Sequence, residues 1–120
     1  MNYSEMSDFE INKAVLEVLS DFPVHPVPRN GSSAAGTQIA THSVLHWFDY
    51  CNSWDDAGLI IEAYKISINA HGKHAWMAWR NTGNTLEEIS SNRHQFSVMN
   101  EKPLRAVMEC FLMMHEAVYA

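Results

Sequence analysis

Apolar side chains recur at helical spacing near both ends of the chain. In the first such segment, Ser7 and Glu10 form the pattern of a capping box, in which each side chain accepts the backbone N–H of the other residue. The apolar positions that follow lie on one helical face: Ile11, Ala14, Val15, Val18 and Leu19. This pattern predicts a helix over residues 8–19.

A second and longer helical pattern covers residues 101–119, with Asn100 as its cap and Pro103 in its first turn, where no intrahelical bond is lost. One side of this helix is almost entirely apolar, with Leu104, Val107, Met108, Phe111, Leu112, His115 and Val118. The helix is apolar around most of its circumference, so it needs cover on more than one side. We expect a homodimer, most simply twofold, with Ala106 and Met113 at the interface. Alternatively, the proline-rich segment 22–28 folds back over these two residues.

Strands are predicted between the two helices. Residues 37–48 are rich in β-branched and aromatic side chains, which favours one strand. Alternating residues on both sides of Gly72 favour a hairpin of 65–69 and 74–80, and a further short strand is expected at 96–98. The chain is therefore predicted to be an α+β sandwich, with an antiparallel sheet of about four strands packed by N-terminal and C-terminal helices.

Two segments lack the patterns of helices and strands. Residues 22–36 have prolines at positions 23, 26 and 28 and are then rich in Gly, Ser and Ala, so we predict a loop with little to bury. Residues 81–93 are polar and are also predicted to be a surface loop, in which Thr85 and Glu88 can cap one short turn. The 120 residues fit a single domain, 1–120.

Polar and aromatic side chains crowd the segment between the predicted strand and a second helix. Ser53 can cap that helix, which should begin at Trp54. A polar and aromatic loop at a helix start offers oriented hydrogen bonds and stacking area. The predicted recognition residues are Asp49, Tyr50, Asn52, Trp54 and Asp55. The alternative is that Tyr50 and Trp54 only fasten the helix to the core.

Chemistry at this segment is a competing hypothesis. Cys51 could act as a nucleophile with His46 as its base, beside Asp49, but the carboxylates around it would raise the pKa of the thiol. Free cysteines are more often simply buried. His42 and His46 with Asp49 form the best-placed metal candidate, yet no motif fixes three ligands, so no metal and no cofactor are predicted.

Composition narrows the classes of partner. The formal net charge is −6 and the chain has only eight Lys and Arg residues, which makes nucleic acid an unfavourable partner. Two cysteines are too few for a disulfide framework, and no segment resembles a leader or a membrane span. These features predict a cytoplasmic protein without membrane contact.

Three blocks of sequence resemble the NinX-like proteins of lambdoid phages and prophages. They are SEMSDFEINKAV at 4–15, FDYCNSWDDAGLII at 48–61 and KPLRA at 102–106, followed by FLMM at 111–114. The chain departs from the family at Leu59, where a proline is often expected, and in the insert 81–93. The resemblance implies a small phage or prophage protein of the bacterial host cytoplasm, with a helix and sheet sandwich, no established activity and no catalytic residues.

We therefore predict a phage accessory protein that binds a host protein or a small ligand without catalysis. The alternative is a small enzyme that uses Asp49, Cys51 and His46. A third possibility is an acidic inhibitor that mimics DNA, which would require carboxylates at phosphate-like spacing on one face.

Overall fold

The structure is a computed structural model that describes residues 2–38, 44–91 and 95–119. It contains helices and antiparallel strands in one chain, which confirms the predicted α+β class. The elements in order are η1 (Tyr3–Glu5), α1 (Asp8–Leu19), β1 (Ala35–Gln38), β2 (Leu45–Phe48), α2 (Trp54–Tyr64), β3 (Ser67–His71), β4 (Ala75–Asn81), α3 (Leu86–Ser90), β5 (Gln95–Asn100) and α4 (Pro103–Tyr119).

Side-chain caps fix the starts of α1 and α2, as the sequence predicts. At α1, Ser7 Oγ accepts from the Glu10 amide at 3.1 Å, and Glu10 Oε1 accepts from the Ser7 amide at 3.2 Å. At α2, Ser53 Oγ accepts from the Asp56 amide at 3.3 Å. Each bond satisfies an amide that the first helical turn leaves without a partner.

The described strands form two antiparallel sheets rather than the single sheet of about four strands that was predicted. One sheet pairs β1 with β2, and the other has the order β3-β4-β5. The predicted hairpin around Gly72 is confirmed, since β3 and β4 pair with His71 opposite Ala75 and Gly72 adopts a φ of 70°.

The prediction of one strand over residues 37–48 is wrong. Thr37 lies opposite His46, so the chain has reversed direction between β1 and β2. The predicted loop 22–36 also extends too far, because β1 begins at Ala35 and Gly36 is buried. The Trp47 ring covers Gly36 so closely that a Cβ atom there would approach it to 2.8 Å. An aromatic residue on the partner strand thus gives this small-residue segment a reason to be buried.

The segment predicted as the surface loop 81–93 contains the short helix α3. Thr85 Oγ1 accepts from the Glu88 amide at 3.1 Å, which is the short capped turn that the sequence indicates. Leu86 and Ile89 of this helix are exposed, so α3 adds nothing to the core.

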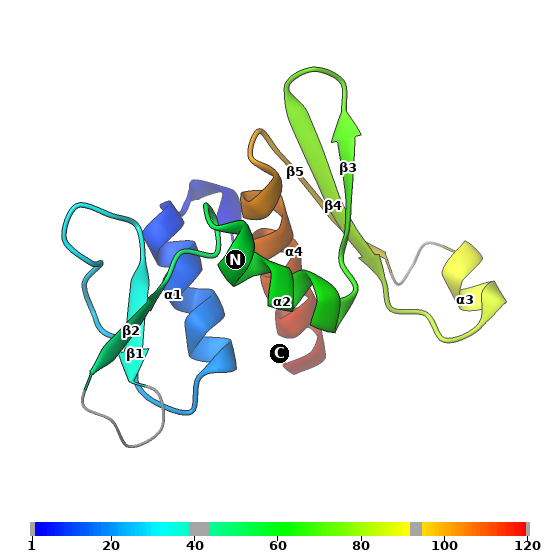
Figure 1. Cartoon of the computed structure of the whole chain (residues 1–120). Coiled ribbons are helices and arrows are strands. Elements are labelled where there is room, and N and C mark those ends of the chain that lie inside the picture. The colour runs from blue at the N-terminus through cyan, green and yellow to red at the C-terminus, as the bar shows by residue number, and fades with distance from the viewer. Residues whose placement is uncertain (1, 39–43, 92–94, 120) are drawn as a thin grey trace.

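Helix α4 lies at the centre of the molecule (Figure 1). It packs against β4 and β5 on one side and against α1 and α2 on others, while α1 also contacts β1. The two sheets therefore lie on either side of the α1 and α4 pair (Figure 1). The largest fully buried apolar side chains are Ile11, Val15, Val107, Met108 and Phe111. No helix in the described ranges is long and apolar enough to cross a lipid bilayer.

Candidate binding surface

The loop between β2 and α2 is held to α1 through the Asp49 carboxylate. Its Oδ1 accepts from Asn12 Nδ2 at 2.7 Å and from Asn52 Nδ2 at 3.0 Å, and its Oδ2 accepts from Ser33 Oγ at 2.9 Å. The Asp49 amide donates to Asp56 Oδ2 at 2.9 Å. Asp49 therefore acts as a brace that joins α1, the loop before β1 and the start of α2.

Asn12 is the buried half of this brace. Its amide nitrogen donates to the Ser33 carbonyl at 3.0 Å as well as to Asp49, and its Oδ1 accepts from the Cys51 amide at 2.9 Å. Both groups that surround the nitrogen can only accept, and the Cys51 amide can only donate, so the orientation of the side-chain amide is determined. Every polar atom of this fully buried residue is satisfied.

Asn52 is exposed, yet its side chain is held in place. The nitrogen lies 3.2 Å from Asp8 Oδ2, 3.2 Å from Ser33 Oγ and 3.0 Å from Asp49 Oδ1. Two carboxylates can only accept hydrogen bonds, which requires the nitrogen to face them and the oxygen to face away. No residue in the described part of the chain donates to that oxygen, so Asn52 Oδ1 is an oriented acceptor at the surface.

Basic side chains from α4 complete the network at Asp8. Lys102 Nζ and Arg105 Nη1 both bind the Asp8 carboxylate, the latter at 2.7 Å. Burial alone would raise the pKa of Asp8, but the hydrogen bonds from Lys102, Arg105 and Asn52 outweigh it and hold the pKa below its usual value. Asp8 therefore stays ionised at neutral pH.

Arg105 is itself almost fully buried, and all three of its guanidinium nitrogens donate hydrogen bonds. Besides Asp8, it donates to Glu109 Oε2 at 2.9 Å and to the carbonyls of Tyr3 and Met6 at 2.9 and 2.6 Å. Burial opposes the charge, but the two carboxylates together raise the pKa of Arg105. Arg105 is thus a structural cation, already committed to partners within the chain.

Trp54 and Asp55 form the first turn of α2 and are exposed. The Trp54 side chain is 59% exposed, and Leu59 further along the same helix is 75% exposed. A Cβ atom built on Gly58 meets nothing within 4 Å, so the surface beside these residues is open. Asp55 makes no ion pair with any described residue. Together with Asn52, this segment presents an acceptor, an aromatic face and a carboxylate, and we call residues 52–55 the α2 surface.

The structure separates Tyr50 from the other predicted recognition residues. Its side chain is only 5% exposed, and its ring stacks on Phe48 with centroids 5.7 Å apart and an interplanar angle of 4°. Tyr50 therefore packs into the core, as the alternative interpretation expected, whereas Trp54 does not. Asp49 and Asn52 meet in one network, and Trp54 and Asp55 follow directly along the chain.

The geometry gives the cysteine hypothesis no support. Cys51 is 1% exposed, and its thiol lies 3.9 Å from the Asp8 carbonyl oxygen. Burial and the nearby Asp8 carboxylate raise the pKa of Cys51 to about 12, which strongly disfavours the thiolate nucleophile. His46 is exposed on β2. Of the metal candidates, His42 falls outside the described residues, and within the described ones no group of three His, Cys, Asp or Glu side chains could hold a metal ion.

The two predicted interface residues differ in exposure. Ala106 is completely buried within the single chain, so it has no surface to offer a second copy. Met113 is partly buried and lines a groove between α4 and β5. The proline-rich segment pairs instead with β1, through the bridge from Val24 to Thr37 and the hydrogen bond of 2.7 Å from the His25 amide to the Gly36 carbonyl.

Sequence reasoning missed the residues that hold the surface in place, namely Asp8, Asn12, Ser33, Lys102 and Arg105. One signal was present: Asn12 lies one helical turn before Leu16, at a position that the α1 pattern turns toward the core. An amide at such a position requires partners from elsewhere in the chain.

The sequence that forms this network can be compared with known protein families. A family model described as bacteriophage P22 NinX matches residues 2–115. The chain belongs to the NinX family. The match includes Asn12 and Asp49, the α2 surface, Lys102, and Arg105 of α4, so the whole network lies within the matched residues. No curated protein matches the chain. Membership in the NinX family supports an accessory protein of a phage.

Proposed function

We propose that the protein is a noncatalytic binding protein that uses the α2 surface to bind a basic segment of a host protein in the bacterial cytoplasm. The observation that carries the proposal is that Trp54 and Asp55, successive residues in the first turn of α2, are both exposed, and that Asp55 forms no ion pair with any described residue. An arginine or lysine can lie over an indole face and pair with a neighbouring carboxylate at the same time. The net charge of −6 favours the approach of such a segment.

Rigidity of the loop supports the same function. The Asp49 and Asn12 brace fixes the backbone before α2, and three acceptors hold the Asn52 nitrogen. A surface that is already ordered loses little conformational entropy on binding. Asn52 Oδ1 can therefore accept a hydrogen bond from the partner without rearrangement. A cation over an exposed ring contributes about 0.5–1 kcal/mol, and more when binding removes water from it.

Capture experiments with matched variants test this function. The tagged wild-type chain, Trp54→Ala, Asp55→Asn and the control Trp76→Ala are incubated with lysate of a host bacterium at low and high salt. Trp76 is a partly exposed tryptophan on β4, outside the α2 surface. We expect a host protein that wild type and Trp76→Ala retain, that both α2 variants lose, and whose capture weakens as salt rises.

A second experiment identifies the basic residues of the captured protein that contact the α2 surface. The captured protein is expected to lose binding when its own arginines or lysines at the contact are replaced. If every variant captures the same proteins equally, the α2 surface is not the binding site. The DNA-mimic alternative is distinguished by the partner: it requires a DNA-binding protein whose capture is competed by duplex DNA.

A further inference from the structure

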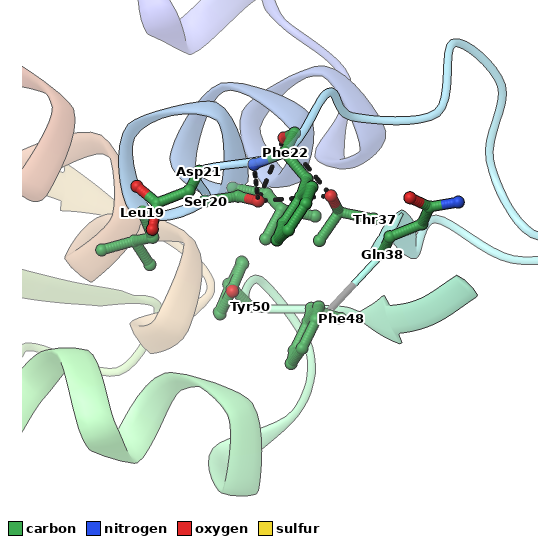
Figure 2. A pocket seen from close by; sticks show the side chains of 9 residues that line it. Leu19, Ser20, Asp21, Phe22, Thr37, Gln38, Phe48 and Tyr50 are labelled. Carbon is green, nitrogen blue, oxygen red and sulfur yellow. Dashed lines mark hydrogen bonds between the residues drawn. The ribbon is translucent and has the colours of Figure 1, made fainter. Parts of the chain in front are cut away.

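A pocket of about 290 Å³ lies between the end of α1, the segment that follows it, and the β1-β2 sheet (Figure 2). This volume is close to the lower limit of small-molecule sites, about 300 Å³. Figure 2 shows Phe22 on one wall and Phe48 with Tyr50 on the other. Leu19 closes one end, and Asp21 and Gln38 lie at the rim. The pocket shares only Tyr50 with the residues predicted for recognition.

Hydroxyl groups of the chain fix the shape of this pocket. Ser20 Oγ and Thr37 Oγ1 are 3.2 Å apart and bonded, and Ser20 Oγ also accepts from the Phe22 amide at 3.0 Å. Thr37 Oγ1 donates to the Pro23 carbonyl at 2.9 Å. These bonds, drawn in part in Figure 2, hold the Phe22 segment against β1. The hydroxyls of Ser20 and Thr37 are therefore occupied by bonds within the chain.

Tyr50 is the polar group that the frame does not use. Only 5% of the residue is exposed, yet no residue of the described ranges forms a hydrogen bond with its phenolic hydroxyl. The hydroxyl still reaches solvent, because every described side-chain N or O atom that is sealed from solvent has a partner. A ligand that displaced water from this hydroxyl without bonding to it would lose about 1–3 kcal/mol, so a ligand with an acceptor at this point is favoured over one without.

The hydroxyl can act only as a neutral donor or acceptor. Burial and the nearby Asp56 carboxylate raise the pKa of Tyr50 above its usual value, so it does not ionise at neutral pH. The stacked Phe48 ring holds the Tyr50 ring in one plane. Its hydroxyl is therefore presented in a fixed direction relative to the aromatic walls.

Charge at the rim restricts the ligand further. Asp21 and Gln38 are exposed, and none of the described residues that line the pocket is a Lys, Arg or His. A phosphate or carboxylate group would meet Asp21 with no compensating cation among those described residues, which disfavours anions. An amino group on the ligand could instead donate to the Asp21 carboxylate or to the Gln38 carbonyl oxygen.

We propose that this pocket binds a small, uncharged, amino-substituted nitrogen heterocycle of nucleobase size. Its ring lies between Phe22 and the Phe48-Tyr50 pair, a ring nitrogen or carbonyl accepts from the Tyr50 hydroxyl, and its amino group points to the rim. The aromatic walls supply most of the binding energy, and the two polar edges supply the discrimination. The proposal is independent of the α2 surface, since none of these contacts involves Asn52, Trp54 or Asp55.

The test is an NMR titration of the wild-type chain with adenine, adenosine, AMP and benzene. We expect saturable shifts with adenine and adenosine, centred on the amides of residues 20–22 and 48–50, and at least tenfold weaker binding of AMP and benzene. Tyr50→Phe keeps the ring and removes only the hydroxyl, so adenine should bind roughly tenfold more weakly, which corresponds to about 1.4 kcal/mol. Tyr64→Phe is the matched control, because Tyr64, at the end of α2, packs against Phe111 of α4 and lies outside the pocket.

Each other outcome overturns the proposal. Absence of saturable shifts with both adenine and adenosine in the millimolar range means that the pocket is not a site for heterocycles. Equal binding of benzene means that it is only an apolar cavity. Equal adenine affinity of Tyr50→Phe and wild type means that water, rather than a ligand, satisfies the hydroxyl. Binding of AMP as tight as that of adenosine contradicts the role given to Asp21.

Discussion

The Asn12 amide nitrogen donates a hydrogen bond of 2.7 Å to the Asp49 carboxylate, across 37 positions of sequence. Asn12 is completely buried in α1, and Asp49 belongs to the loop that precedes α2. The same asparagine accepts from the Cys51 amide at 2.9 Å. One side chain of α1 thus donates one hydrogen bond to the loop and accepts another from it, so the conformation of the loop depends on α1.

Asn12→Ala should therefore lower the free energy of unfolding by about 2–3 kcal/mol, since it leaves the Cys51 amide and the Ser33 carbonyl without their partner. Urea denaturation measures the change. Asn30→Ala, at an exposed loop position, is the control and should change stability by less than about 0.5 kcal/mol. Equal stabilities of the two variants would show that water replaces the Asn12 amide at no cost.

Ser53→Ala should lower stability by about 1 kcal/mol without changing the fold or the oligomeric state, because it removes the bond from Ser53 Oγ to the Asp56 amide. Thermal unfolding followed by circular dichroism measures the loss. Thr85→Ala removes an equivalent cap from the exposed α3 helix and should have a smaller effect, since that helix contributes nothing to the core. An unchanged melting temperature for Ser53→Ala would refute the role of this cap.

Stability should fall in acid because the pKa of Asp8 is held low in the folded chain by Lys102, Arg105 and Asn52. The unfolded state takes up a proton at a pKa of about 3.9, before the folded state does. The contribution of Asp8 is therefore complete above that pH and is lost as pH falls through the lower folded pKa. Asp8→Asn should be less stable at pH 7 and should lose less stability between pH 5 and pH 2. Urea denaturation across this range, with Asp21→Asn as the exposed control, measures both effects; a wild-type acid loss in Asp8→Asn would contradict the assignment.

Cys51 should be unreactive in the folded chain. It is buried, and its pKa is raised to about 12 by burial and Asp8, while burial raises the pKa of Cys110 to about 11. A disulfide reagent at pH 8 is expected to label neither thiol until urea unfolds the protein, after which both react. Rapid labelling of Cys51 alone under native conditions would restore the hypothesis of a cysteine nucleophile.

Self-association remains a prediction that centres on Met113. This residue lines a groove of about 560 Å³ beside Met99, which is 51% exposed. Light scattering at tens of micromolar should give a mass of twice 13.7 kDa. Met113→Asp should weaken the association but leave the monomer folded, whereas Phe111→Asp should unfold the chain, because Phe111 is fully buried. A strictly monomeric wild type would exclude the dimer, and equal behaviour of the two variants would mean that the helix faces are wrongly assigned.

Local patterns were sufficient to predict α1, α2, α4, the short capped turn at Thr85 and the hairpin. The Ser7, Ser53 and Thr85 caps involve residues only three positions apart, and the turn at Gly72 depends on one glycine at positive φ. Such interactions are encoded within a few residues, so they can be read directly from the sequence.

Contacts between distant segments were not predictable in the same way. Gly36 is buried because Trp47 covers it from the neighbouring strand, and nothing near Gly36 in the sequence indicates this. The Asn52 side chain depends on Ser33 and Asp8, and Tyr50 turns toward residues that follow α1. The loop before α2 could be recognised as polar and aromatic, but the division of its side chains between surface and pocket required the three-dimensional structure.

The bonds from Arg105 to the carbonyls of Tyr3 and Met6 also constrain the time at which the chain can fold. Helix α4 leaves the ribosome after every other described element. Until then, α1 lacks the apolar surface of α4 against which it packs, and the carbonyls of Tyr3 and Met6 lack the Arg105 guanidinium that donates to them. Nascent chains that stop before Pro103 should therefore remain open to proteases and chaperones, and the native structure should form only when the last helix has been synthesised.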